Sequence, residues 1–326
     1  MRDTSDKLNA HRARMHELAA KTDLIASRIP SGSILVDYPI YRNIGDILIH
    51  RGSEAALARQ QVQLRDRFAY PDLGKIQGGT FHLGRRFAQF DRMMADCPML
   101  LFQGGGNLGD LWPNHQLLRE ALIARYPHVP CTILPQSAHF GSEQALDQCR
   151  RIFGAHRQLT LYCRDQETMA ALGSAVDCSE APDMAHGLWE TLPRRSAPKR
   201  SGLLVQSRRD PERAETASPE NGFDWDDCEP KAEVVIWRAL VTTRRFSALG
   251  SVRAAGDALW NRLADRWLGR AIERVGSAEA LQTDRLHGLI LATLLETPVR
   301  FSDNKYGKLG RYAACWFGGD PLIVRH

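Results

Sequence analysis

A histidine and an arginine two residues apart are the residues of this sequence whose types and spacing point most clearly to chemistry. Arg285 and His287 lie in the stretch QTDRLHG (282–288), which leads into the apolar run LILATLLE. If Thr283 or Asp284 caps a helix there, His287 falls in its first turn, where free backbone N–H groups attract anions. Arg285 adds a planar fork for carboxylate or phosphate, and histidine transfers protons near neutral pH. The segment therefore predicts an anion site with a proton donor; a structural histidine that caps the turn is the alternative.

Two further segments, each directly after a predicted strand, share asparagine, glycine and aspartate. Asn43 and Asp46 belong to NIGD, and Asn107 and Asp110 belong to GGGNLGD (104–110). We expect all four at the carboxyl edge of a parallel sheet, facing one cleft, where their amides and carboxylates can hold the hydroxyls of a sugar. Helix capping by Asp46, and by Asn107 or Asp110, is the alternative.

The glycines of GGGNLGD also satisfy the spacing GxGxxG of a dinucleotide site, through Gly104, Gly106 and Gly109. The strand before them is not the first of its domain, however, and the next strand ends in Pro135-Gln136 rather than in the acid that would hold a ribose. We therefore expect a glycine loop that turns tightly or lets the backbone approach a ligand, and no NAD or FAD.

Further basic groups follow the predicted strand VRFS. The loop NKYGK (304–308) places Lys305 or Lys308 at the same sheet edge as His287, with solvated surface lysines as the alternative.

Apolar runs that alternate with helical patterns must position these groups. Runs such as SILVDYPI, CPMLLFQGGG and VPCTILPQS predict buried strands, and segments 3–28, 47–61 and 142–156 predict helices. This alternation predicts an α/β fold with parallel sheets in two Rossmann-like domains and a cleft between them. The predicted boundaries are 1–188 for the first domain, 189–201 for a linker and 202–326 for the second domain.

Three segments resist this scheme. Residues 67–84, rich in glycine and aromatic residues, fit neither pattern, and EVVIWRAL (233–240) is ambiguous between strand and helix. The acidic stretch 211–230 is expected to be an exposed insertion, and its role stays open.

Composition narrows the function classes. The formal net charge of the 326 residues is only +5, and no stretch combines clustered basic residues with aromatics, so nucleic acid is not implied. The seven cysteines include no CxxC pair, which favours buried thiols in a reducing compartment over disulfides or a zinc site. Without an apolar signal peptide or membrane-spanning run, we expect a cytoplasmic protein.

In their order along the chain, NIGD, GGGNLGD, LPQS, YCRDQET, PDMA, TDRLHG and DNKYGKL resemble the motifs of polysaccharide pyruvyl transferases. The resemblance implies a two-domain fold like that of GT-B glycosyltransferases, with phosphoenolpyruvate as donor and a pair of sugar hydroxyls as acceptor. It makes the N-terminal domain the acceptor side and the C-terminal domain the phosphoenolpyruvate side. It implies no metal and no cofactor besides the phosphoenolpyruvate co-substrate.

The resemblance also implies roles for individual residues. Arg285 and His287 match the family's Arg-x-His, Arg164 matches an arginine that faces the donor, and Lys308 matches the basic residue of a closing loop. His287 would then protonate the donor, and Asn43, Asp46, Asn107 and Asp110 would line the acceptor side. His287, Asp46 and Asp110 remain alternative bases for the acceptor hydroxyls.

The acceptor of such an enzyme is commonly a lipid-linked oligosaccharide, which implies peripheral contact with the inner membrane face. A GT-B-type glycosyltransferase that uses nucleotide sugars, and a non-catalytic protein that binds glycans or anions, are the alternative functions.

Overall fold

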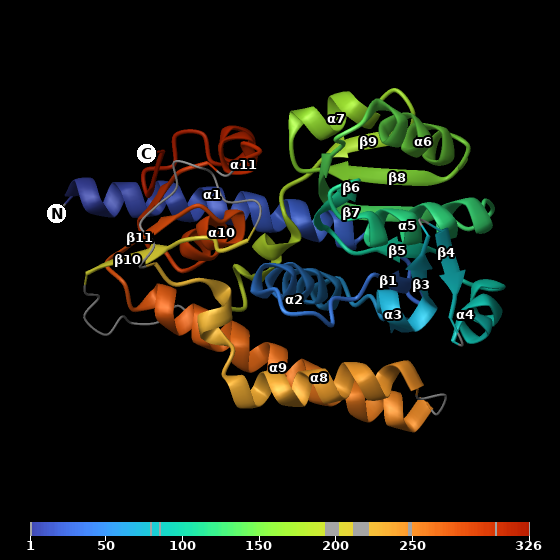
Figure 1. Cartoon of the computed structure of the whole chain (residues 1–326). Coiled ribbons are helices and arrows are strands. Elements are labelled where there is room, and N and C mark those ends of the chain that lie inside the picture. Colours follow the sequence, from blue (N-terminus) through green and yellow to red (C-terminus); the bar gives the residue numbers. More distant parts are fainter. Residues whose placement is uncertain are drawn as a thin grey trace.

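The structure is a computed structural model that describes residues 2–78, 80–84, 86–192, 202–210, 222–246, 250–303 and 305–325. Within these residues it contains two parallel sheets, a small antiparallel hairpin and eleven α-helices, so the predicted α/β class is confirmed. Helices and strands alternate over most of the chain (Figure 1). No described helix is long and apolar enough to cross a membrane.

The first sheet carries seven strands, all parallel, in the order β2-β1-β5-β7-β8-β9, with β6 paired to β7. Its central strands are buried on both faces because helices cover the sheet on both sides, as their continuous apolar runs predict. The strands are β1 (Ile34–Val36), β2 (Asp66–Phe68), β5 (Leu100–Phe102), β6 (Gly105–Gly109), β7 (Cys131–His139), β8 (Leu159–Cys163) and β9 (Asp177–Glu180). The helices that follow them include α2 (Ile44–Arg59), α4 (Phe87–Met94), α5 (Pro113–Arg125), α6 (Glu143–Gly154) and α7 (Gln166–Leu172).

The second sheet has four parallel strands in the order β10-β11-β12-β13. They are β10 (Leu203–Gln206), β11 (Ala280–Thr283), β12 (Val299–Phe301) and β13 (Ile323–Arg325), with helices α10 (Leu286–Leu294) and α11 (Lys308–Trp316) in the connections. Helix α10 is almost entirely buried, and a single 3-10 turn, η1 (Met184–Leu188), follows the last strand of the first sheet.

Helix α1 (Arg2–Ala26) connects the N-terminus to the second half of the fold, and Figure 1 shows it running beside α10. The His11 ring, fully buried, lies 2.8 Å from Asp320 Oδ2 through Nδ1 and 2.9 Å from the Thr293 carbonyl oxygen through Nε2. Arg12 adds a bidentate pair with Glu296. The N-terminal helix therefore packs on the half of the chain farthest from it in sequence.

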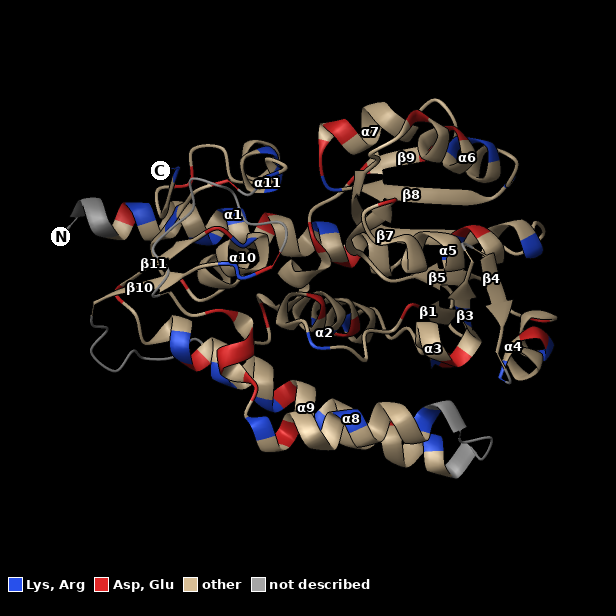
Figure 2. Ribbon diagram, viewed as in Figure 1, with Lys and Arg blue, Asp and Glu red and all other residues tan. Residues whose placement is uncertain are grey.

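Helices α8 (Lys231–Phe246) and α9 (Gly250–Gly276), from the second half of the chain, pack on the first half. They lie side by side below α2 (Figure 1), and residues of both signs alternate along them (Figure 2). Arg244 donates to both oxygens of buried Asp72, and Arg253 pairs with Asp66. One continuous apolar core therefore includes residues of α2, α9 and α10.

Several local predictions are wrong or incomplete. GGGNLGD is not a glycine loop, because residues Gly105–Gly109 form strand β6 beside β7. The unassigned segment 67–84 contains a turn of helix, α3 (Tyr70–Leu73), and the hairpin β3 (Gly74–Gln77) and β4 (Thr80–Leu83). EVVIWRAL lies in helix α8.

Parts of the predicted linker and of the acidic insertion lie outside the described residues, namely 193–201 and 211–221. Within the remainder of the insertion, Trp225–Cys228 form a short 3-10 turn, η2. The prediction of an exposed insertion is wrong for these described residues, because Phe223, Trp225 and Cys228 are buried in the apolar core. All seven cysteines are free, and five of them are buried.

Candidate active site

Two predicted site residues from the two sheets meet at one buried carboxylate. Arg164 follows β8 of the first sheet, and its Nη1 donates to Asp183 Oδ2. His287, the second residue of α10, lies with Nε2 3.4 Å from the same oxygen. Asp183 begins the 3-10 turn η1, where its other oxygen accepts from the Ala185 backbone N–H.

The charge of Asp183 is stabilised by these neighbours. Burial alone would raise its pKa, but the Arg164 guanidinium and His287 outweigh that effect and hold the pKa of Asp183 well below its ordinary value. The carboxylate is fully buried and Arg164 is 1% exposed, so neither charge is well solvated. Asp183 therefore orients both the arginine and the imidazole at the boundary between the sheets.

Glycines let the charged groups approach the backbone closely. A Cβ on Gly45 would lie 2.4 Å from His287 Nδ1, so the ring rests directly on the first turn of α2. A Cβ on Gly106 would lie 3.3 Å from Arg164 Nη2 and 3.7 Å from Lys308 Nζ. Two cationic groups, one from each sheet, therefore flank the same backbone of β6, and His287 joins them through Asp183.

The lysine of this site is Lys308 rather than Lys305. Lys308 is buried at the first position of α11, after Gly307 in the left-handed conformation at φ 68°. Lys305 is exposed. Of the two lysines in the polar loop, only Lys308 is therefore placed close to Arg164.

Asp46 lies close to strand β6, because a Cβ on Gly105 would be 3.4 Å from its Oδ1. It is partly buried on α2, and its charge contributes, after burial, to raising the pKa of Tyr41. Burial raises the pKa of Asp46 itself, with His287 acting in the opposite direction. Asn43 rather than Asp46 caps α2, by accepting from the Gly45 N–H at 2.9 Å, so the capping alternative for Asp46 is wrong.

Asn107 is held in a network of buried polar groups. Its oxygen accepts from Arg119 Nη2 at 2.9 Å and Gln136 Nε2 at 3.0 Å, and its Nδ2 donates to Asp37 at 3.3 Å. Neither Asn107 nor Asp110 caps the next helix, since α5 begins after Trp112. Both Asp110 oxygens instead accept from the Gly141 backbone N–H, at the turn into α6.

Arg285 makes a different set of contacts. Its Nε and Nη2 form a bidentate pair with Asp224, at 2.5 and 2.6 Å, and Nη2 also lies 3.0 Å from Asp210. These contacts leave Nη1 outside the pair. Arg285 is itself the N-cap of α10, so the prediction that Thr283 or Asp284 caps this helix is wrong. Asp284 accepts from the Arg208 N–H instead.

Sequence reasoning missed three acidic and basic residues near this site. Asp183 lies in the segment PDMA, which is one of the resembling motifs, but no chemical role was predicted for it. Asp37 directly follows β1, a position that could have been noticed, whereas His115 lies in an amphipathic helix without any local signal.

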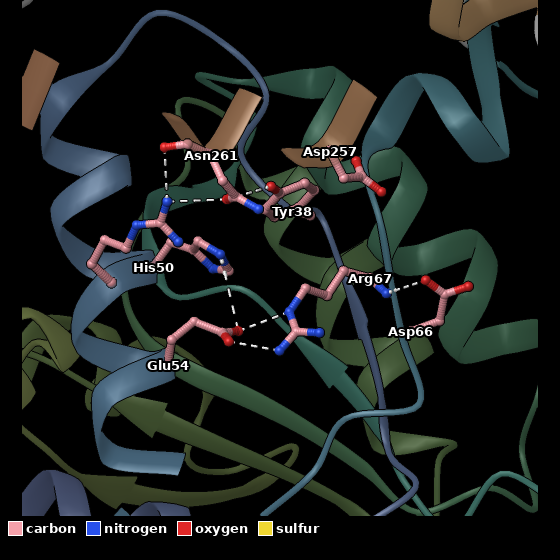
Figure 3. Close-up of a pocket in the computed structure, with 8 residues that line it drawn as sticks. Tyr38, His50, Glu54, Asp66, Arg67, Asp257 and Asn261 are labelled. Carbon is pink, nitrogen blue, oxygen red and sulfur yellow. Dashed lines mark hydrogen bonds and ion pairs between the residues drawn. The ribbon is translucent and has the colours of Figure 1, made fainter. Parts of the chain in front are cut away.

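A polar pocket of about 190 Å³ lies beside α2 (Figure 3). His50, one helical turn beyond Asp46, lines it, and Asn261 of α9 accepts from both Tyr38 and Arg51 at 3.0 Å. Arg67 closes another wall through a bidentate pair with Glu54. These contacts join α9 to α2 and the first sheet.

The architecture and the site define an α/β protein with two parallel sheets and a cationic site at their boundary. The family model for polysaccharide pyruvyl transferase matches residues 43–306, so the chain belongs to that family and is a pyruvyltransferase whose acceptor is a glycan.

Similar proteins agree with this assignment. Bacillus subtilis "Putative pyruvyl transferase EpsO" is 30% identical, covering 96% of this chain and 95% of that protein. "Pyruvyl transferase 1" of Schizosaccharomyces pombe is 27% identical over 88% of this chain and 70% of its own length. The crystal structure of an uncharacterised Klebsiella pneumoniae protein matches with a TM-score of 0.55 at 17% identity, over 95% of this chain and 98% of that one, and shares the fold.

Proposed function

We propose that the chain transfers the pyruvyl group of phosphoenolpyruvate to a polysaccharide or lipid-linked oligosaccharide. The product is a cyclic pyruvate ketal on one sugar, and inorganic phosphate is released. The observation that carries the proposal is the meeting of Arg164 and His287 on Asp183, with Lys308 beside Arg164.

The donor explains why this site needs several cations and one proton donor. Phosphoenolpyruvate carries a phosphate and a carboxylate, which Arg164 and Lys308 are positioned to neutralise and orient. The carbon that must accept a proton is its methylene, and His287 is the proposed acid. Protonation there builds oxocarbenium character at the neighbouring carbon, which a sugar hydroxyl then attacks.

Arg285 remains a proposed donor ligand. Because Asp224 and Asp210 engage Nε and Nη2, Nη1 is the nitrogen left for the donor in this arrangement. Asn43, Asp46, Asn107 and Asp110 remain the proposed acceptor side. Of these four, Asp46 shares the first turn of α2 with Gly45, on which the His287 ring rests.

The two-sheet architecture fits a GT-B-like arrangement, in which the predicted domain 1–188 holds the acceptor and 202–326 most of the donor. Lipid linkage of the acceptor and peripheral membrane contact belong to the same proposal. The family assignment does not favour the nucleotide-sugar alternative.

Incubation with phosphoenolpyruvate and a panel of lipid-linked and synthetic glycosides tests the proposal. We expect phosphate release only when a glycan is present, together with a glycan that gains one pyruvyl group by mass spectrometry. His287→Ala should abolish both signals, while the exposed His128→Ala serves as the matched control. Stabilisation by nucleotide sugars, with no response to phosphoenolpyruvate, would contradict the proposal.

A further inference from the structure

A second histidine close to the site is held by its own buried carboxylate. His115 is the third residue of α5, and its Nδ1 lies 2.8 Å from both oxygens of Asp37. The Asp37 side chain is 2% exposed, whereas that of His115 is 18% exposed. A hydrogen bond from Nδ1–H to a carboxylate leaves the lone pair on Nε2, which is the atom that can accept a proton from a ligand.

The carboxylate is fixed from several directions. Asp37 directly follows β1 and adopts φ 66°, a left-handed conformation that is uncommon for a residue other than glycine. Asn107 donates to it at 3.3 Å, and Arg119 lies 3.9 Å away. Burial would raise the pKa of Asp37, but His115 and Arg119 outweigh it and lower the pKa. Asp37 is therefore charged when it orients the ring.

This pair adjoins the groups that face the proposed donor. Asn107, which donates to Asp37, follows Gly106, the residue flanked by Arg164 and Lys308. Asp46 interacts electrostatically with both His287 and His115, so the same carboxylate lies near both histidines. The molecule thus presents two imidazoles at one site, each hydrogen-bonded to its own buried aspartate.

We propose that His115, oriented by Asp37, is the general base that deprotonates the attacking sugar hydroxyl. The inference rests on the proposed function and assigns the base that the sequence left open among His287, Asp46 and Asp110. Asp110 has both oxygens engaged by backbone N–H groups near α6, and His287 is already used as the acid. Unlike Asp46, His115 is held by a buried carboxylate, because Asp37 fixes its Nδ1 side and leaves Nε2 for the hydroxyl.

The proton count closes with two histidines. The first hydroxyl gives its proton to Nε2 of His115 while its oxygen bonds to the central carbon of the donor, and the methylene carbon takes a proton from His287. In the second step the neighbouring hydroxyl oxygen bonds to the same carbon, and the bond to phosphate breaks with its electron pair on phosphate. The proton on Nε2 of His115 leaves with the phosphate, and the second hydroxyl gives its proton to His287, so both rings return to their starting states.

The surroundings of His115 set the direction of its pH dependence. Burial would lower the pKa of His115, but Asp37 and Asp46 raise it above the ordinary value, with Arg119 opposing. The rings of Tyr41 and Tyr70 pack against it at 5.6 and 6.2 Å between centroids. A base must be unprotonated, so kcat/KM should fall on the acidic side, with a midpoint above the ordinary histidine value of about 6.5.

His115→Gln tests the assignment, because glutamine keeps a donor for Asp37 but removes the base. We expect kcat to fall by about 100-fold or more, the range of general-base catalysis, with phosphoenolpyruvate affinity within about twofold of wild type. The fall of kcat/KM on the acidic side of the pH profile, the acidic limb, should disappear in His115→Gln. In His115→Ala, added imidazole should restore part of the activity. A purely structural role would produce neither effect.

The exposed His128→Gln is the matched control and should behave as wild type. Thermal unfolding of each variant separates loss of fold from loss of the base. Wild-type rates and an unchanged acidic limb in folded His115→Gln would overturn the inference, as would transfer of that limb's dependence to Asp46→Asn. A wild-type enzyme that pyruvylates no glycan would instead refute the proposed function on which the inference rests.

Discussion

Gly45→Ala adds one methyl group and should slow the enzyme strongly without unfolding it. The added Cβ would lie 2.4 Å from His287 Nδ1 and 2.8 Å from its Cγ, whereas ordinary contacts begin near 3.4 Å. The ring must therefore move by about 1 Å, and a misplacement of that size in a catalytic group costs about 100-fold in rate. This loss corresponds to about 2.7 kcal/mol of transition-state stabilisation.

Stability should respond differently from rate. Gly45 is the second residue of α2, where the helical preference of alanine over glycine, at most about 1 kcal/mol, offsets part of the steric cost. Gly269→Ala on α9, where an added Cβ meets no atom within 4 Å, is the matched control and should keep the wild-type rate. The assay is glycan-dependent phosphate release, with urea unfolding in parallel. A folded Gly45→Ala enzyme with the wild-type rate would refute the placement of His287 over this turn.

Two further predictions concern stability. Arg244→Met should cost about 1.5–3 kcal/mol in urea unfolding, because it removes one of the two arginines that pair with buried Asp72 and leaves Arg86, whereas exposed Arg238→Met should stay within about 0.5 kcal/mol. Burial lowers the pKa of His50 and of His186 to about 4, so the unfolded chain binds more protons below pH 6.5. As the pH falls from 6.5 to 4, the free energy of unfolding should fall by about 1.4 kcal/mol per pH unit for each histidine. A His50→Gln variant whose free energy of unfolding depends on pH as steeply as that of the wild type would contradict this.

The strand–helix order could be predicted because buried parallel strands appear as continuous apolar runs. The sequence signal failed at β6, where residues GGNLG have low strand propensity and only pairing with β7 makes them a strand. Helix α8 was ambiguous for a related reason: EVVIWRAL combines β-branched residues with a helical surface that packs on α9.

The candidate site was partly visible in the sequence. Arg164, His287 and Lys308 could be named from their motifs, and the structure brings them together, although their roles stay predictions. The ion pair of Arg285 could not be foreseen, because its partner Asp224 is 61 residues away and lies in a segment without a recognised pattern. The contact of His115 with Asp37 spans 78 residues, a pairing that only the tertiary fold creates.

The packing partner of helix α1 could not be predicted from local sequence patterns either. The periodicity of α1 predicts a helix but not that it packs on Asp320 and Thr293 at the opposite end of the chain. Tertiary burial decides such placements, because several apolar faces compete for one core.

The most direct test of the central claim is a calorimetric titration of phosphoenolpyruvate into the wild type and three variants. Arg164→Lys and Lys308→Met alter one cation from each sheet, and exposed Lys305→Met is the matched control. If both sheets hold the donor, the first two variants should each bind at least about 10-fold more weakly, the loss of one charge-assisted contact, and the control should bind as the wild type does. Wild-type affinity in folded Arg164→Lys and Lys308→Met would contradict the account.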